Sequence, residues 1–264
     1  MSPITERATA GDALHLTGLC KSFGGMKVLV DFNLAIPREP DTAVAVLGQN
    51  GAGKTTLLNL VTRLLPADSG AITIDGVDVV PLPSRALAHQ GVGRTFQSPR
   101  LLLDDTVIDN VLLGSVAQGK WGRGGRAAQV KRAEAALEQV GLHQLARRPI
   151  RSLPFGSRKL VELARALVSQ PRLLLLDEPA AGLSQVEEER LAQILIQLRQ
   201  SGVILLLIEH RMLLVTAVAK RVVMMDSGRI VFDGNVNEAL ESPIVREGYL
   251  GTKATEHAWL RGSK

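Results

Sequence analysis

Gly48-Gln49-Asn50-Gly51-Ala52-Gly53-Lys54-Thr55 is the stretch of sequence that decides the fold. It fits the phosphate-loop pattern G-x-x-x-x-G-K-[ST]. It follows a short apolar strand expected at residues 44–47 and opens a helical pattern that stops before Pro66. Glycines let backbone N–H groups close around phosphate oxygens, and the helix N-terminus adds a favourable dipole. The sequence therefore predicts a loop that binds the phosphates of a nucleotide.

The phosphate-loop pattern predicts roles for individual residues. Lys54 is expected to reach the β- and γ-phosphates, and the Thr55 hydroxyl is expected to bind Mg²⁺. A glycine-rich turn ahead of a core helix is the alternative, but it leaves the strand, the spacing, the lysine and the threonine unexplained. The predicted nucleotide contacts are Gly48, Gln49, Asn50, Gly51, Ala52, Gly53, Lys54, Thr55 and Thr56.

Acidic residues follow a second apolar strand, expected at residues 173–176. Asp177 at the end of this strand can hold the Mg²⁺ shell, and Glu178 can position or deprotonate an attacking water. Taken alone, the two acids could simply be solvated at a strand end, but a phosphate loop in the same chain favours the catalytic interpretation. A third apolar strand, at residues 203–208, leads to Glu209 and then His210, whose imidazole can reach a γ-phosphate from that position.

Continuous apolar strands that alternate with helices predict an α/β protein with a parallel sheet covered on both faces. Residues 14–36 resemble strands joined by turns, whereas residues 98–170 show mostly helical spacing. Within the helical part, residues 120–126 form an expected basic loop. Ser184 and Glu187 predict a capping box, and Gly202 suits the end of the same helix. Residues 222–232 predict a hairpin.

The composition excludes several classes of protein. The 264 residues are 45% hydrophobic and 22% charged, which is typical of a globular chain and excludes a mostly disordered one. Apolar runs stay well short of the roughly 18–20 residues that span a bilayer. A single cysteine, Cys20, excludes an intrachain disulfide, and the N-terminus lacks a secretory signal, so we expect a cytoplasmic chain. The net charge of +5 tolerates an anionic partner.

Taken together, these motifs resemble the ATP-binding subunit of an ABC transporter. In that resemblance residues 48–55 match the Walker A loop and residues 173–177 match Walker B. The resemblance implies that Phe23 stacks on adenine. It also implies the following roles: Gln97 as the Q-loop glutamine near the metal, Glu178 as the catalytic glutamate and His210 as the switch histidine. The match runs from about residue 14 to residue 251.

The resemblance implies a P-loop NTPase core with a parallel sheet, an N-terminal antiparallel β subdomain and a helical insert. The core with its β subdomain is expected at residues 13–97 and 171–251, and the helical subdomain that bears the signature at 98–170. Flexible tails are expected at 1–12 and 252–264. A finer resemblance, carried by residues 94–97, 177–183, 208–212 and 248–251, is to importer subunits for branched-chain amino acids and related solutes; urea importers and lipopolysaccharide-export ATPases share parts of it.

The signature is where the sequence departs from the family. The usual Leu-Ser-Gly-Gly-Gln is replaced here by Leu153, Pro154, Phe155, Gly156 and Ser157. Pro154 has neither a hydroxyl nor an N–H donor, although a helix expected at residues 158–168 can still offer backbone donors. Ser184 stands where an acidic or amide residue is common, and Gln49 replaces a proline. We expect an asymmetric pair, in which the site capped by Pro154 is weak.

The sequence thus predicts an ATP-hydrolysing subunit that energises a membrane transporter for branched-chain amino acids or a related small solute. ATP and Mg²⁺ are the expected cofactors. The expected partners are integral-membrane permease subunits and a second ATPase chain, either a different chain, which the altered signature favours, or a second copy of this one. No nucleic acid is expected, and the chain is expected at the inner face of the cell membrane. Two alternatives are open: a soluble ABC-type ATPase acting on DNA or ribosomes, and a regulatory nucleotide-binding subunit with weak turnover. A GTPase is disfavoured because no Asn-Lys-x-Asp motif occurs.

Overall fold

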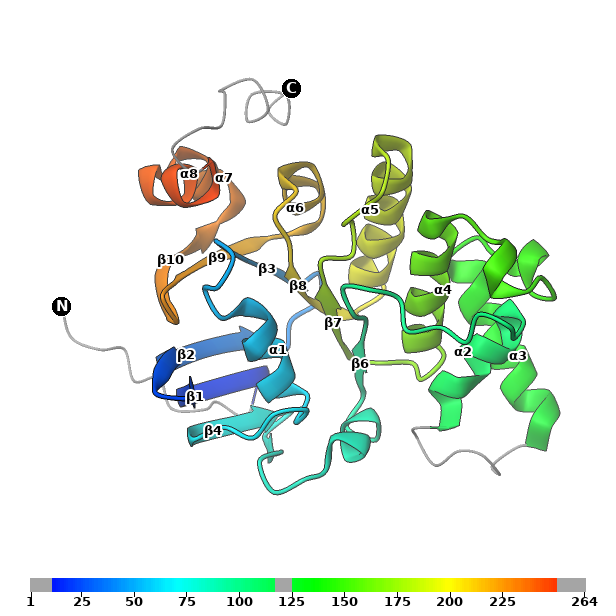
Figure 1. Cartoon of the computed structure of the whole chain (residues 1–264), viewed down its shortest axis with the longest axis horizontal. Helices are drawn as coiled ribbons and strands as arrows, with labels where there is room; N and C mark the ends of the chain where they lie inside the picture. The colour runs from blue at the N-terminus through cyan, green and yellow to red at the C-terminus, as the bar shows by residue number, and fades with distance from the viewer. Residues whose placement is uncertain (1–10, 117–124, 251–264) are drawn as a thin grey trace.

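A six-stranded sheet forms the centre of the computed structural model, which describes residues 11–116 and 125–250 (Figure 1). Its strand order is β10-β9-β3-β8-β7-β6, with β10 antiparallel to β9 and every other neighbouring pair parallel. This is the parallel sheet that the apolar strands predicted. The strands are β3 (Ala43–Gly48), β6 (Val92–Arg94), β7 (Leu173–Asp177), β8 (Ile204–Ile208), β9 (Arg221–Asp226) and β10 (Arg229–Asn235).

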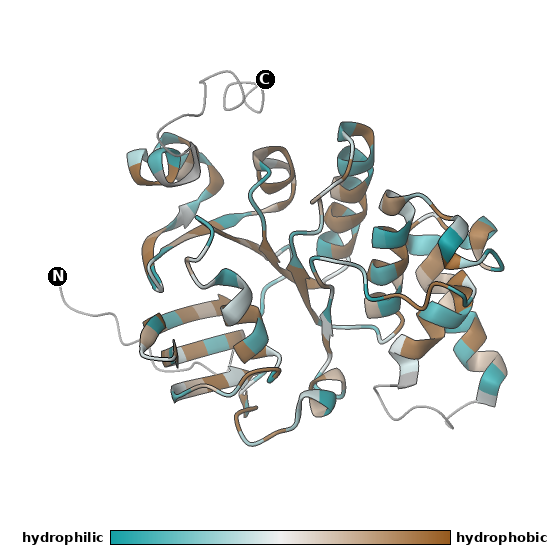
Figure 2. Cartoon of the chain, viewed as in Figure 1, coloured by the Kyte–Doolittle hydropathy of each residue, from teal (hydrophilic) through white to brown (hydrophobic). Residues whose placement is uncertain are grey.

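Packing on both faces explains the continuous apolar strands. Every residue of β7 and β8 is buried. Along β3, Ala43, Ala45 and Leu47 face one hydrophobic core, while Val44 and Val46 face the other. Because successive side chains of a strand point to opposite faces, a strand between two cores must be apolar throughout. Figure 2 shows these central strands coloured mostly as hydrophobic.

A second sheet of four strands is antiparallel throughout, in the order β2-β1-β4-β5. This confirms the predicted N-terminal β subdomain. The predicted tail of residues 1–12 is corrected at its end, because Asp12 pairs with Pro37 at the start of β1; residues 1–10 lie outside the described part. The strands are β1 (Asp12–Phe23), β2 (Met26–Pro37), β4 (Ser69–Ile74) and β5 (Val77–Asp78).

Three helices, α2, α3 and α4, pack together in the segment between β6 and β7, shown in green in Figure 1. Gly114 of α2 allows a close approach to α4, because a Cβ there would lie 2.0 Å from the carbonyl oxygen of Arg165. The boundaries predicted for this helical subdomain stay a prediction. The helices are α1 (Lys54–Val61), α2 (Val107–Val116), α3 (Gly125–Gln139), α4 (Phe155–Leu167), α5 (Gln185–Gln200), α6 (Met212–Val218), α7 (Val236–Glu241) and α8 (Pro243–Leu250), with 3₁₀ turns at Ser84–Ala88, His143–Leu145 and Ile150–Ser152.

The expected basic loop lies only partly within the described residues. The predicted basic loop at 120–126 is too long at its end, because Gly125 and Arg126 open α3, and Gly125 takes a positive φ that glycine tolerates. Residues 120–124 and the predicted tail at 252–264 lie outside the described residues. Within 11–116 and 125–250, no helix is both long and apolar enough to cross a membrane.

Candidate functional site

The phosphate loop joins the end of β3 to the start of α1, as the sequence predicts. Gly48 and Gly53 both have positive φ angles, of 151° and 100°. A Cβ on Gly48 would lie 2.5 Å from the carbonyl oxygen of Met225, and one on Gly53 would lie 2.8 Å from that of Val28. Larger residues are therefore excluded at both positions by backbone conformation and by space. The loop keeps its shape because these two glycines let β2 and β9 approach.

Lys54 is the first residue of α1, and its side chain lies against the loop. Its Nζ donates to the carbonyl oxygens of Gly48 at 2.7 Å and Gln49 at 2.9 Å. Burial lowers the pKa of Lys54, while the charges of Glu178 and Asp177 raise it in part. The ammonium group is thus largely removed from water and close enough to the two acids to feel their charge. A phosphate group entering the loop would supply the negative charge that this buried cation favours.

Asp177 ends β7 and is nearly buried. Its Oδ2 lies 3.4 Å from Arg94, whose guanidinium also donates to Thr62 Oγ1 at 2.6 Å. Burial raises the pKa of Asp177, and the charge of Arg94 partly offsets this effect. A carboxylate in this setting is costly when ionised, which favours a cation close by.

Glu178 has a positive φ of 46°, which is uncommon for a residue with a side chain. Its N–H donates to the carbonyl oxygen of Ile208 at 3.0 Å, so the β7–β8 pairing continues one residue further. Its carboxylate accepts from Gln97 Nε2 at 2.8 Å and lies 3.9 Å from His210 Nδ1. Glutamate, glutamine and histidine, which come from three separate segments, therefore meet at the carboxyl end of the parallel sheet.

Lys159 is a site residue that the sequence reasoning missed. This nearly buried lysine of α4 donates to the carbonyl oxygens of Gln97 at 2.7 Å and Glu178 at 3.0 Å. Burial lowers the pKa of Lys159, which the surrounding carboxylates partly offset. Lys159 therefore links α4 to Gln97 and to Glu178. Nothing in the local sequence marks it, because a lysine on a helix is usually a solvated surface residue.

Glu162, one turn after Lys159, was also missed. Its buried carboxylate accepts from the N–H of Phe96 at 3.3 Å and the N–H of Arg100 at 3.5 Å, and it pairs with Arg165. Burial raises the pKa of Glu162, and Arg165 lowers it in part. Because Phe96 precedes Gln97, this carboxylate helps to fix the backbone on which Gln97 lies.

Phe23 lies at the end of β1 with its ring 43% exposed. The ammonium of Lys21 lies 5.5 Å from the ring centroid. An exposed ring offers the flat apolar surface that stacking needs. The predicted contact with adenine stays a prediction.

The segment 153–157 forms the start of α4. The helix begins at Phe155, three residues before the predicted Arg158, because Pro154 is its N-cap and the fixed φ of proline suits that position. Pro154 makes no side-chain capping bond. Leu153 and Gly156 are buried, whereas the ring of Phe155 is 46% exposed.

Ser184 and Glu187 form the predicted capping box at the start of α5. Ser184 Oγ accepts from the N–H of Glu187 at 3.4 Å, and the N–H of Ser184 donates to Glu187 Oε2 at 2.9 Å. The same carboxylate packs on Gly156, where a Cβ would lie 2.1 Å from Glu187 Oε1. Ser184 thus has a structural role in its own helix.

The residues fit a Mg²⁺ ion that is shared with a nucleotide. Within residues 11–116 and 125–250 no group of three His, Cys, Asp or Glu side chains could hold a metal on its own. Mg²⁺ is normally held by one or two carboxylates together with substrate phosphates and waters. Asp177 supplies such a carboxylate, and Thr55 follows the loop lysine at the start of α1.

Comparison with known proteins gives consistent results. Residues 31–181 match the family described as ABC transporter. The chain is 35% identical over 251 residues to the high-affinity branched-chain amino acid transport ATP-binding protein BraF of Pseudomonas aeruginosa, covering 90% of this chain and 97% of that protein. Crystal structures of a nucleotide-free ATP-binding cassette from an ABC transporter and of a cassette in its ADP conformation give TM-scores of 0.82 and 0.81. Each is 30% identical and covers 91% of this chain and 99% of the other.

Proposed function

The chain belongs to the ABC transporter family, and from that premise we propose that it binds and hydrolyses ATP to energise a membrane transporter. The solute that we propose is a branched-chain amino acid or a related small molecule, as for the relative BraF. The observation that carries the proposal is the convergence of Gln97, Glu178 and His210 beside a phosphate loop whose lysine faces the same acids.

We assign the reaction steps to residues of this chain. Backbone N–H groups of residues 48–55 and the Lys54 ammonium hold the phosphates. Glu178 accepts a proton from the attacking water, whose oxygen forms a bond to the γ-phosphorus as the bond to the β–γ bridging oxygen breaks. ADP leaves with that electron pair, and the proton passes from Glu178 to the inorganic phosphate. Gln97 and His210 orient the water and the γ-phosphate on either side of the carboxylate.

Thr55, Asp177 and Gln97 are the residues that we propose to hold Mg²⁺ together with the phosphates. A bound Mg²⁺ neutralises negative charge that develops between the β- and γ-phosphates. Asp177 is suited to this role because its carboxylate is buried at the end of β7 and lies 3.4 Å from the Arg94 guanidinium, so burial still raises its pKa. The Lys54 ammonium lies against the loop carbonyls of Gly48 and Gln49.

We propose that two ATPase chains pair head to tail on permease subunits, with the start of α4 covering the phosphate of the partner site. Pro154 offers neither a hydroxyl nor an N–H to that phosphate, although the N-terminal turn of α4 still offers backbone donors. Loss of one donor aimed at a developing charge costs about 10²–10³ in rate. When the partner is a different chain that supplies an intact signature, the pair is asymmetric: this chain's own site turns over, and the site that Pro154 covers is slow.

Uptake of radiolabelled leucine, isoleucine and valine tests the solute. We compare cells that lack the chain with cells that carry either the wild type or Lys54→Met. We expect uptake to be restored by the wild type and not by Lys54→Met, since the variant lacks the phosphate-binding ammonium. Equal uptake in all three strains would contradict the amino acid assignment. Screening of other solutes would then follow, because the ATPase assignment does not depend on this result.

A further inference from the structure

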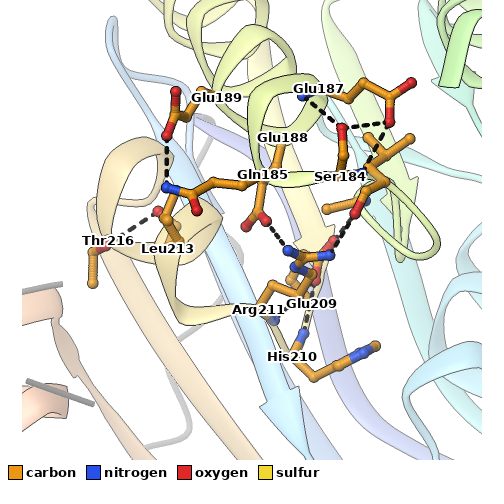
Figure 3. Close-up of polar contacts among 12 residues, drawn as sticks. Ser184, Gln185, Glu187, Glu188, Glu189, Glu209, His210, Arg211, Leu213 and Thr216 are labelled. Atoms are coloured by element: carbon orange, nitrogen blue, oxygen red, sulfur yellow. Dashed lines mark hydrogen bonds and ion pairs between the residues drawn. The ribbon is translucent and has the colours of Figure 1, made fainter. Parts of the chain in front are cut away.

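A network of charged residues lies beside the backbone of His210 and takes no part in the reaction described above (Figure 3). His210 follows β8 and Glu209, and it is followed by Arg211, the residue before α6. The side chain of His210 is 55% exposed. Packing therefore restricts this side chain only in part, and the backbone that carries it also determines how it lies against Glu178.

Glu209 is buried, and its carboxylate binds backbone on both sides of the site. One oxygen accepts from the N–H groups of His210 at 2.9 Å and Arg211 at 3.1 Å, and the other accepts from the N–H of Ala180 at 2.8 Å. Ala180 lies two residues after Glu178. The carboxylate of Glu209 thus connects the segment that carries the histidine to the segment that carries the catalytic glutamate.

Arg211 makes a second connection to the same region. Its guanidinium pairs with the carboxylate of Glu188, in the first turn of α5, and donates to the carbonyl oxygen of Leu183 at 3.0 Å. Glu188 is fully buried. The start of α5 is itself fixed by the capping box of Ser184. Figure 3 shows the Arg211 guanidinium between the Glu188 carboxylate and the backbone that precedes Ser184.

We infer that Glu188, Glu209 and Arg211 form a clamp that positions His210 against Glu178, and that Arg211 is a positioning residue for ATP hydrolysis. This inference rests on the proposed function. The residue before His210 is fixed because the Glu209 carboxylate binds Ala180, and the residue after it is fixed because the Arg211 guanidinium binds Leu183. Both contacts are with the segment that joins Glu178 to α5. Arg211 acts through His210, its neighbour in the chain, because its guanidinium is engaged by Glu188 and by the carbonyl oxygen of Leu183.

The clamp predicts separate effects on turnover and on folding. Replacing Arg211 alone leaves the Glu188 carboxylate buried without its cation, which is destabilising whatever Arg211 does for catalysis. Replacing both members of a buried ion pair by apolar residues of similar size is often neutral for stability. The double variant Glu188→Leu/Arg211→Met therefore removes the Arg211–Glu188 arm of the clamp without leaving the Glu188 charge buried, while Glu209 keeps its backbone contacts.

The experiment measures the melting temperature, kcat and KM for ATP of the full-length chain in the complex with which it co-purifies. For Glu188→Leu/Arg211→Met we expect a melting temperature near that of the wild type. We expect kcat to be about 10-fold lower and KM to be within about twofold, since a misplaced group slows the reaction without touching the phosphate loop. Arg211→Lys keeps a positive charge but not the planar guanidinium, so its kcat should lie between that of the double variant and that of the wild type.

Arg221→Gln is the matched control. Arg221 also joins a carboxylate, that of Asp233 at 2.6 Å, to a carbonyl oxygen, that of Ala35 at 2.7 Å, but at the opposite end of the central sheet. We expect it to lower the melting temperature and leave kcat unchanged. A kcat of the double variant within about twofold of the wild type would overturn the inference. A wild-type complex without ATPase activity would instead contradict the proposed function.

Discussion

Gln97 and Glu178 lie 81 positions apart in the sequence, yet the amide nitrogen of Gln97 donates to the Glu178 carboxylate at 2.8 Å. Lys159 binds the backbone carbonyl of each of them, so a helix of the segment between β6 and β7 holds the pair together. A movement of α4 would therefore be felt at both residues. Lys159 thus links α4 directly to the backbone of Glu178, whose carboxylate we propose to be the catalytic base.

Glu178→Gln is expected to separate ATP binding from hydrolysis. The amide keeps the size of the side chain but cannot take a proton from water, so kcat should fall by about 10²–10⁴-fold. Binding of ATP should change by less than about threefold, because the phosphates contact the loop and not this residue. Steady-state ATPase assays and equilibrium binding of a fluorescent ATP analogue check this. A variant that hydrolyses ATP at the wild-type rate would remove Glu178 from its role as the base.

Lys54→Met should lower both ATP binding and turnover. The loss of the ammonium leaves the phosphates without their cation, so the affinity for ATP should fall by at least about 10-fold, together with turnover. Titration calorimetry with ATP and with adenosine checks the cause. Adenosine binding should be unchanged, since the nucleoside carries no phosphate, and an equal loss for both ligands would indicate a folding defect instead.

Pro154→Ser tests the asymmetric pair. Serine restores a hydroxyl and an N–H at the start of α4, so the site of the partner chain should turn over faster, by up to about 10²-fold. The measurement is the ATPase rate of the reconstituted pair in which this chain also carries Glu178→Gln, so that its own site contributes little. If the rate does not rise, Pro154 is not what limits the partner site.

Glu162 should make folding stability depend on pH. Burial raises the pKa of Glu162 above its ordinary value of 4.5, so the folded chain binds this proton more readily than the unfolded chain. The free energy of unfolding should therefore decline as pH rises from about 4.5 through the folded pKa. Glu162→Gln removes this contribution and should flatten the decline. Urea denaturation at a series of pH values measures it, and parallel curves for both chains would contradict the prediction.

Local patterns were enough to predict the phosphate loop, the buried strands and the capping box. A loop of fixed spacing between a strand and a helix depends on neighbours in the chain, as does the pairing of Ser184 with Glu187. A strand between two cores reveals itself as a continuous apolar run, as in β7 and β8. The roles of Phe23 and of the signature came from resemblance, and they stay predictions.

The sequence could not predict contacts between residues that are far apart in the chain, because no local sequence pattern marks such residues. Lys159 and Glu162 resemble the exposed residues of any amphipathic helix, although both are buried against the site. Arg211 similarly resembles a surface arginine until α5 brings Glu188 beside it. The predicted start of α4 at Arg158 is wrong. A proline that lacks an N–H donor can still be the N-cap of a helix, and Pro154 is the N-cap here.

The most direct test of the account is to purify the tagged full-length chain at its native level from detergent-solubilised membranes and to identify what co-purifies. The account predicts a permease with many membrane helices together with a second, different ATPase chain. Recovery of two copies of this chain with a permease would support the transport function but contradict the asymmetric pair. Recovery in the soluble fraction alone, bound to nucleic acid or ribosomes, would contradict the transport function itself.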